Sequence, residues 1–173
     1  VSRDRYAPGM RFFVYVARVE DEAKGDPKVI LSRKNINLVV KLFEMNTPEL
    51  EEGTVEIVKI VREPGFKTKL IVASEFEEID PAGSLIGPKG TRVKTVVEEL
   101  SGEKVDVINY SDSNRELIAA ALNPATVVDV VINEEEDSAT ALVVKEDEVK
   151  AIGRNGGNVR LAEQLTGYRI SLK

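Results

Sequence analysis

The segments "LIGPKG" (residues 85–90) and "AIGRNG" (residues 151–156) carry the pattern Ile-Gly-x-x-Gly twice. Gly153 follows Gly87 by 66 residues, an interval that is the size of a small domain. After each copy, apolar residues recur at helical spacing. The repeat therefore predicts a duplicated unit in which a glycine loop stands directly before a helix.

Hydrophobic periodicity outlines the elements of the first unit. Apolar residues recur at i, i+3, i+4 and i+7 from Ile36 to Phe43 and again from Val93 to Leu100, which indicates two amphipathic helices. Runs of β-branched residues indicate strands. The predicted elements are a helix at 35–45, strands at 54–61 and 67–73, helices at 80–86 and 91–100, and a strand at 104–108.

The second unit repeats the same order of elements. Ser113 and Glu116 have the spacing of a capping box, which marks the start of its first helix. The predicted elements are a helix at 111–122, strands at 127–132 and 139–144 around the acidic turn "NEEED" (133–137), helices at 145–152 and 158–165, and a strand at 168–172. Only residues 109–112 join the units, which is too short for a free linker. We therefore expect the two units to pack in a fixed relation.

Before the first unit, residues 11–19 and 28–33 indicate two strands, joined by a charged turn at 20–28. Two strands alone are marginal in water, so they should pair with further strands or pack on the next domain. The chain also begins at Val1 without a methionine. We take this as a sign that it is a piece of a longer protein.

A glycine pair between helices has two interpretations. It can simply make a tight turn, because glycine adopts positive φ. It can also clamp a nucleic-acid backbone, because phosphates approach a loop without Cβ atoms and meet free N–H groups at the next helix N-terminus. The repetition, together with Ile86 and Ile152 as apolar floors for unstacked bases, favours the clamp. This is how KH domains hold about four nucleotides of single-stranded RNA.

Basic residues gather at both loops, although the usual interpretation of scattered Lys and Arg is a solvated helix face. Their position beside the glycines favours contact with phosphates. Pro88 has no N–H, so the first loop offers one backbone donor fewer than the second. The candidate RNA-binding residues are Ile86, Gly87, Pro88, Lys89, Gly90, Arg92 and Lys94 in the first unit, and Ile152, Gly153, Arg154, Asn155, Gly156, Asn158 and Arg160 in the second.

Composition restricts the possible functions. The 173 residues include no histidine and no cysteine, which excludes Ser-His and Cys-His nucleophiles and thiolate zinc sites. We expect no catalytic residue, no metal site and no cofactor. The absence of cysteine fits a reducing compartment, so we expect the protein in the cytoplasm, and no apolar run is long enough to cross a membrane.

The net charge is −6, which on its own argues mildly against nucleic-acid binding. The acidic excess lies away from the loops, however, in residues 20–22, 75–80 and 133–137. Binding depends on the local potential, so the clamp hypothesis survives this objection.

Four segments carry a family resemblance: "VEIVKIVREPGFKTKLIVAS" (55–74), "DPAGSLIGPKGTRVKTVVEELSGEKVDVINYSD" (80–112), "LIAAALNPA" (117–125) and "AIGRNGGNVRLAEQLTGYRISL" (151–172). They resemble the tandem KH region of the bacterial NusA family of transcription elongation factors, and the likeness covers residues 35–173. Residues 6–19 and 28–35 resemble the end of that family's preceding OB-fold RNA-binding domain.

The resemblance implies an α+β fold with two tandem KH domains of the prokaryotic, helix-first type. It implies three regions: the C-terminal part of an OB-fold at 1–34, a first KH domain at 35–110 and a second at 111–173. It also implies single-stranded, nascent RNA as a partner, with RNA polymerase and other transcription factors as partners of the intact protein. The implied activity is modulation of transcriptional pausing, termination and antitermination.

Three other interpretations stay open from the sequence. A KH scaffold used for protein contacts often loses its loop glycines, and all four are present here. A stand-alone archaeal relative with two KH units would not explain the two strands upstream. An enzyme is disfavoured, because a phosphate-binding Walker loop needs Gly-Lys-Ser/Thr, whereas Lys89 is preceded by Pro88 and followed by Gly90.

Overall fold

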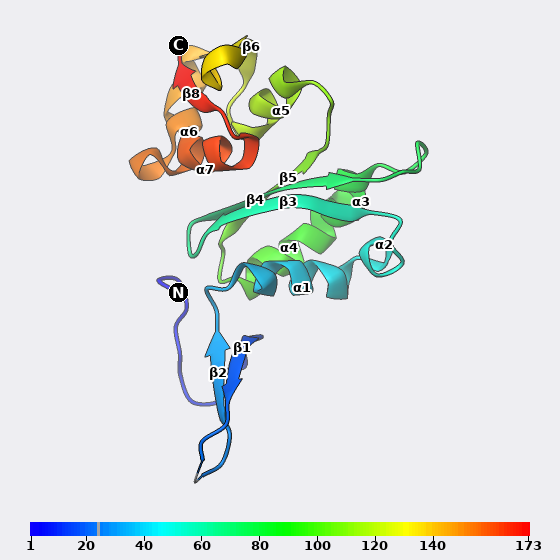
Figure 1. The fold of residues 1–173 in the computed structure, drawn as a ribbon, viewed down its shortest axis with the longest axis vertical. Helices are drawn as coiled ribbons and strands as arrows, with labels where there is room; N and C mark the ends of the chain where they lie inside the picture. Colours follow the sequence, from blue (N-terminus) through cyan, green and yellow to red (C-terminus); the bar gives the residue numbers. More distant parts are fainter. Residues whose placement is uncertain (24) are drawn as a thin grey trace.

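The computed structural model describes residues 1–23 and 25–173. This part of the chain forms a two-stranded hairpin and two three-stranded sheets with their helices. The hairpin lies at one end of the molecule, the first unit in the middle and the second unit at the other end (Figure 1). The two glycine loops thus belong to neighbouring units of one elongated molecule.

The N-terminal hairpin pairs β1 (Tyr15–Glu20) antiparallel with β2 (Lys28–Ser32). The prediction of a strand from residue 11 is wrong at its start. Tyr15 faces Ser32, the last residue of β2, so residues 11–14 have no strand to pair with. Instead Arg33 donates a 2.8 Å hydrogen bond to the carbonyl of Phe13. The predicted turn at 20–28 includes Lys24, which lies outside the described residues.

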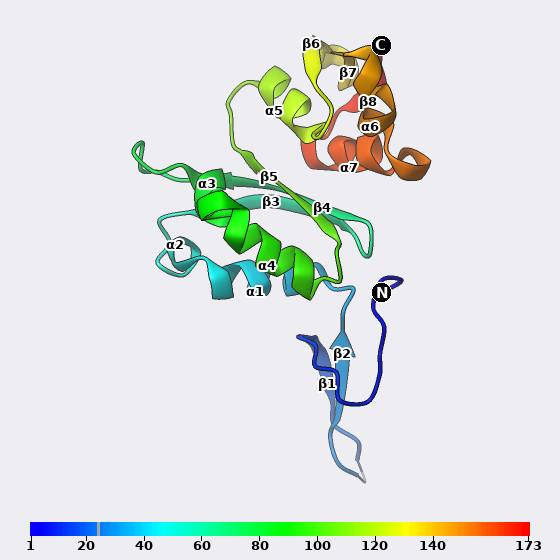
Figure 2. The same cartoon turned by 180° about the vertical axis from the view of Figure 1, so that it is seen from behind.

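The helices α1, α3 and α4 of the first unit lie on one face of its sheet, as Figure 2 shows. In the sheet, the central strand β4 pairs antiparallel with β3 and parallel with β5. Its core includes the buried side chains of Val39, Phe43, Leu70 and Leu85. The elements are α1 (Ile36–Asn46), α2 (Pro48–Glu51), β3 (Glu56–Glu63), β4 (Lys67–Ala73), α3 (Pro81–Ile86), the 3-10 turn η1 (Pro88–Gly90), α4 (Thr91–Glu99) and β5 (Lys104–Asn109).

The second unit repeats this topology, with strand order β6-β7-β8 and the same change from antiparallel to parallel pairing. Ile118, Leu122, Ala141 and Leu161 are among its buried residues. The elements are α5 (Asn114–Ala121), β6 (Val127–Asn133), η2 (Glu134–Glu136), β7 (Ser138–Val143), η3 (Lys145–Asp147), α6 (Glu148–Ile152), η4 (Arg154–Gly156), α7 (Gly157–Thr166) and β8 (Arg169–Leu172).

Two local details differ from the sequence prediction. The single turn α2 was not predicted, and it begins with Pro48, whose missing N–H suits the first helical position. The capping box at α5 forms only by half. The Ser113 hydroxyl accepts from the Glu116 N–H, but the Glu116 carboxylate accepts from the Ser111 hydroxyl instead.

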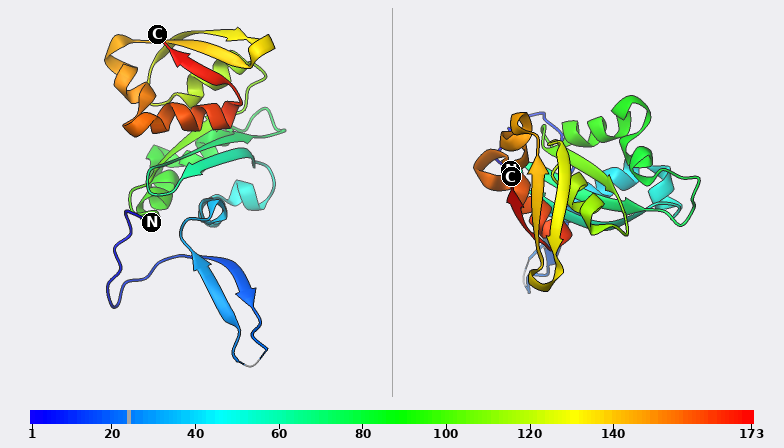
Figure 3. Two further views of the ribbon diagram at one scale, coloured as in Figure 1. Left: turned by 60° about the vertical axis from the view of Figure 1, so that its left-hand side comes forward. Right: turned by 90° about the horizontal axis from the view of Figure 1, so that it is seen from above.

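The outer face of the first sheet packs against α5 and α7 of the second unit. In Figure 3 (left) the orange-red helix α7 lies against the green strands of that sheet. Ile71 and Ile108 of the first unit belong to the same buried cluster as Ile118 and Leu165 of the second. This shared core is the fixed packing of the two units that the short connection at 109–112 predicts.

Polar groups cross the same contact. The Lys69 ammonium donates to the carboxylate of Asp106 at 2.7 Å and to the carbonyl of Asn123, at the end of α5, at 2.9 Å. Lys67 also reaches Asp106, at 3.1 Å. Two buried lysines therefore share one carboxylate, and burial lowers the pKa of Lys69 to about 8.

Buried ion pairs attach the N-terminal segment to the first unit. The Arg33 guanidinium contacts both carboxylate oxygens of Asp4 and donates to the carbonyl of Glu99. This arginine holds the pKa of Asp4 well below its usual range. Nearby, Arg62 pairs with Glu103, which also accepts from the Gly65 N–H and the Thr68 hydroxyl.

Candidate nucleic-acid interface

The two glycine loops have the same backbone conformation. Gly87 has φ 75° and ψ 169°, and Gly153 has φ 72° and ψ 176°. Three residues later Gly90 (φ 73°, ψ 17°) and Gly156 (φ 72°, ψ 11°) again agree within a few degrees. The residues between also match, since Lys89 and Asn155 both have positive φ, at 54° and 52°. Sequence repetition has thus produced the same loop twice.

The two glycines of each loop are required for different reasons. A Cβ on Gly87 would stand 2.6 Å from Cγ of Arg92, and a Cβ on Gly153 would stand 2.5 Å from Cβ of Asn158. At Gly90 and Gly156, by contrast, no heavy atom of the described residues lies within 4 Å of that position. The first glycine of each loop lacks a Cβ because a side chain of the protein fills that space, whereas the second glycine lies next to open surface.

A helix N-terminus follows each open glycine. Gly90 is the N-cap of α4 and Gly156 is the N-cap of α7, and neither helix has a side-chain cap among the described residues. The first N–H of each helix, that of Thr91 or Gly157, donates back to the carbonyl of Pro88 or Arg154. No described side chain caps either N-terminus, however, and the helix dipole favours an anion there.

Most of the predicted contact residues lie at the surface around these loops. Lys89, Arg154 and Asn155 are exposed in the loops themselves. Lys94 is 75% exposed and reaches Glu98 only at 3.7 Å. Ile86 and Ile152, the last residues of α3 and α6, are 36% and 40% exposed, which leaves apolar surface beside each loop.

Arg92 and Asn158 occupy equivalent positions, five residues after the first glycine, and both point inward. Asn158 is 1% exposed, so its side chain is covered by the protein in this structure. Arg92 donates to the carbonyl of Ser84 and pairs with Glu49, both at distances below 3 Å. Both side chains support the loop from behind. Counting five residues from each glycine would have revealed the equivalence in the sequence.

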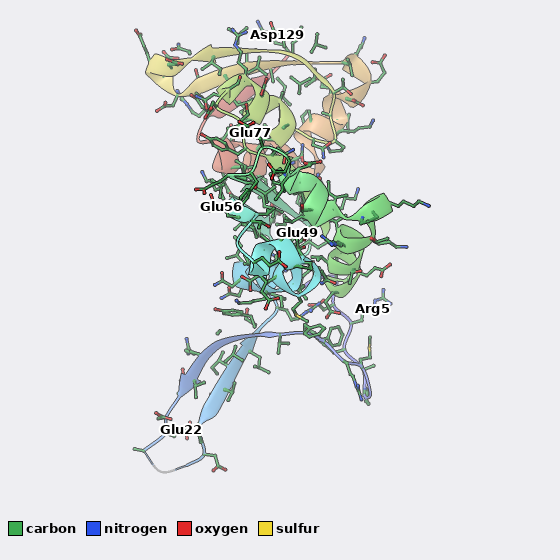
Figure 4. The ribbon with its side chains drawn as sticks, turned by 90° about the vertical axis from the view of Figure 1, so that its right-hand side faces the viewer. Arg5, Glu22, Glu49, Glu56, Glu77 and Asp129 are labelled. Atoms are coloured by element: carbon green, nitrogen blue, oxygen red, sulfur yellow. The ribbon has the colours of Figure 1, made fainter. Side chains whose placement is uncertain are left out.

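Two carboxylates form ion pairs near the loops that no sequence pattern predicts. Glu49, labelled in Figure 4, pairs with Arg92 at 2.9 Å. Glu63 pairs with Arg160 at 3.0 Å, and both of those side chains are about half exposed. Each lies about 40 residues or more from its arginine in sequence, so only the fold brings the pairs together.

The acidic residues 20–22 and 133–137 lie away from the second loop, whereas Asp80, of the acidic cluster 75–80, lines a hollow together with Gly87 and Pro88 of the first loop. Figure 4 shows Glu22 towards the tip of the hairpin and Asp129 at the opposite end of the molecule. The acidic turn η2 is joined to the start of β8 through a hydrogen bond from the Arg169 N–H to the Asp137 carbonyl. Since β8 follows the C-terminus of α7, the helix length of about 15 Å separates this turn from the loop. That exceeds the Debye length of about 8 Å at physiological ionic strength.

Within residues 1–23 and 25–173, no group of three or more carboxylates is arranged to hold a metal ion. In the same ranges, no helix is both long enough and apolar enough to cross a membrane.

Comparisons with known proteins give the family. The family model for the NusA-like first KH domain matches residues 33–110, and the model for the NusA-like second KH domain matches residues 114–173. The chain belongs to the NusA family. The prediction of two tandem KH domains in an α+β fold is thereby confirmed.

Curated relatives match the whole chain. Transcription termination/antitermination protein NusA of Bacillus subtilis is 43% identical over 173 residues, all of this chain and 46% of the relative. The proteins of the same name from Mycobacterium tuberculosis (strain H37Rv) and Thermus thermophilus are each 42% identical, over 100% and 98% of this chain and 50% and 44% of the relatives. The chain therefore spans about half the length of these relatives.

A solved structure, titled "Crystal structure of APE1850", superimposes with a TM-score of 0.52. It covers 78% of this chain and 95% of its own, at 22% identity. This likeness supports the fold alone.

Proposed function

We propose that the chain binds single-stranded RNA with its two Gly-x-x-Gly loops. The observation that carries this proposal is the repeated loop conformation, in which an open glycine precedes a helix N-terminus without a side-chain cap in each unit. A loop that only turned the chain would need neither the open surface at Gly90 and Gly156 nor basic side chains beside it.

In this mechanism, a phosphate lies over the second glycine of each loop, where the positive end of the α4 or α7 dipole attracts it. Lys89 and Lys94 neutralise phosphates at the first loop, and Arg154 and Arg160 do so at the second. The bases turn towards the apolar surface at Ile86 and Ile152. Arg92 and Asn158 keep the loops in shape from behind.

The wider role follows from the family. Relatives that match the whole chain are named transcription termination/antitermination proteins. We infer that this chain acts within a longer protein that binds nascent RNA in the cytoplasm and modulates pausing, termination and antitermination. RNA polymerase and other transcription factors are its proposed partners, and the hairpin β1–β2 is proposed as the end of an OB-fold within residues 1–34.

Titration with a short, unstructured, A-rich RNA, followed residue by residue by NMR, tests this function. We expect shifts of the backbone amides concentrated at 86–94 and 152–160. A scaffold that serves only protein contacts would leave both loops unperturbed. Shifts confined to the hairpin or to the acidic turn η2 would also contradict the proposal.

A further inference from the structure

The turn between β3 and β4 of the first unit, residues 63–67, contacts α7, the helix directly after the second loop, at three places. Glu63 pairs with Arg160 at 3.0 Å. The ring of Phe66 lies so close to Gly157 that a Cβ there would stand 2.7 Å from it. The Lys67 ammonium donates a 3.0 Å hydrogen bond to the Asn158 side-chain oxygen. All three contacts fall on the first turn of α7, directly after the loop.

Asn158 joins this turn to the loop itself. Its side-chain amide donates to the carbonyl of Ala151, two residues before Gly153, at 2.9 Å, and to the carbonyl of Leu122 at 3.2 Å. Its oxygen accepts from Lys67, so one buried side chain links the first unit, α5 and the residues before the loop. Its Cβ also fills the space that a Cβ on Gly153 would need.

The first loop is supported differently. Arg92, at the position equivalent to Asn158, takes its described partners, Glu49 and Ser84, from its own unit. The second loop therefore depends on a neighbouring domain for contacts that the first loop obtains within its own domain. This asymmetry cannot come from the loops, whose backbones are alike.

We propose that the β3–β4 turn of the first KH unit is a positioning element for the second RNA-binding loop, with Lys67 acting through Asn158; this inference rests on the RNA-binding function proposed above. Lys67 and Phe66 hold the first turn of α7 and the loop before it in the conformation that receives a phosphate. The second loop is thus competent only while the first unit is docked beside it.

The energetic basis is the burial of the link. Lys67 is 5% exposed and Asn158 is 1% exposed. Replacing Lys67 by methionine leaves the Asn158 oxygen buried without its donor, and a buried group without a partner drives local rearrangement. Asp106 keeps a partner in Lys69, so the shared ion pair survives the change.

The test compares Lys67→Met with Lys104→Met in the full chain, using the same A-rich RNA. Lys104 lies opposite Lys67 in the parallel pairing of β4 and β5, but it is exposed, so its replacement removes the same charge without touching the link. For Lys67→Met we expect about a tenfold loss of affinity at residues 152–160 and unchanged shifts at residues 86–94. Equal behaviour of the two variants at the second loop would overturn the proposal.

A measurement without RNA separates this inference from the proposed function. The Gly156 N–H donates to the carbonyl of Gly153, and the Gly90 N–H makes the equivalent bond to Gly87. In Lys67→Met, hydrogen exchange at Gly156 should become about tenfold faster, while exchange at Gly90 should not change. Unchanged exchange at Gly156 would sink the positioning role whether or not RNA binds. Faster exchange at Gly156, in a protein whose wild-type loops ignore RNA, would instead remove the proposed function.

A global loss of stability would affect both loops, so the contrast between Gly156 and Gly90 excludes it as the cause. If the far-UV circular dichroism shows that Lys67→Met does not fold, the same measurements are made on Phe66→Leu. It removes the ring against Gly157 and keeps an apolar side chain. The same selective effects at the second loop are expected, and their absence would overturn the proposal.

Discussion

The two glycine loops have one backbone and two different surroundings. Around the first, Arg92 ties the loop to α3 and to Glu49 of the same unit. Around the second, Asn158 ties the loop to Lys67 of the other unit. Duplication has copied the conformation of the loop but not the contacts that maintain it. A local sequence pattern therefore specifies what the loop looks like, whereas the packing of the units decides how firmly it is held.

The largest expected effect comes from reversing the charge of each loop in turn. Pro88→Asp with Lys89→Asp, and separately Arg154→Asp with Asn155→Asp, should weaken RNA binding at the altered loop about a hundredfold, because carboxylates repel phosphates. The melting temperature should hardly change, since these side chains are exposed and aspartate tolerates positive φ. Calorimetric RNA titration and thermal melting are the measurements. Normal binding by either variant would contradict the clamp.

Alanine at the first glycine of each loop should destabilise the two loops to different extents. At Gly153 the new Cβ would stand 2.8 Å from the backbone nitrogen of Asn158, which cannot move away. At Gly87 the three nearest atoms would all belong to the Arg92 side chain, which can partly move away. We expect Gly153→Ala to lower the free energy of unfolding by about 3 kcal/mol and Gly87→Ala by about 2 kcal/mol.

Urea unfolding of both alanine variants measures the difference. Gly156→Ala and Gly90→Ala are the matched controls, because they impose the strain of positive φ without a clash. The idea of two distinct roles for the glycines fails if all four variants lose the same stability.

The contact between the units should respond to pH through Lys69. The pKa of this ammonium is about 8 in the folded protein, against 10.5 for an ordinary lysine. Between these values the unfolded chain binds more protons than the folded one, so the free energy of unfolding should rise as the pH increases through this window. Lys69→Met should lack this rise. Urea unfolding at pH 7.5 and pH 10 measures it, and parallel pH profiles for the two proteins would refute the assignment.

The smallest expected effect concerns the carboxylates that hold the two arginines. Glu63→Gln frees the half-exposed Arg160 for phosphate and should raise the RNA affinity of the second loop about twofold, because an exposed ion pair is worth about 0.5 kcal/mol. Glu49→Gln should change the first loop less, since Arg92 keeps its bond to the Ser84 carbonyl. Affinities measured at one salt concentration would sharpen the comparison. An equal gain in both variants would mean that the two arginines are equally available.

Most of the fold and the centre of the candidate site could be predicted from the sequence. The alternation of helical and strand periods placed the elements of both units, because each has one apolar face and clear terminating residues. The glycines placed the loops. The same reasoning failed for residues 11–14, since a β-rich composition cannot say where a partner strand ends.

The contacts that hold the loops in place could not be predicted from the sequence, for a related reason. Glu63 and Lys67 act on residues of the other unit, and no local period connects them. Asn158 was predicted as a contact because it lies near the loop in sequence, whereas the packing of α7 on the first sheet turns it inward. Side chains near a motif can therefore be identified from the sequence, but not the direction in which they point.

The packing of the first sheet against α7 also gives the tandem arrangement a polarity. Val61 and Ile71 of the first unit lie at this contact, where both are packed in the cluster shared with the second unit. The residues at the same register of the second sheet are Val131 and Leu142, which are 60% and 46% exposed. Each unit thus has a helical face and a sheet face, and the helical face of the second unit packs on the sheet face of the first. A chain with the two units exchanged would have the same composition and the same pair of folds, yet its Lys67 would face solvent and the Asn158 loop would stand unsupported at the leading end.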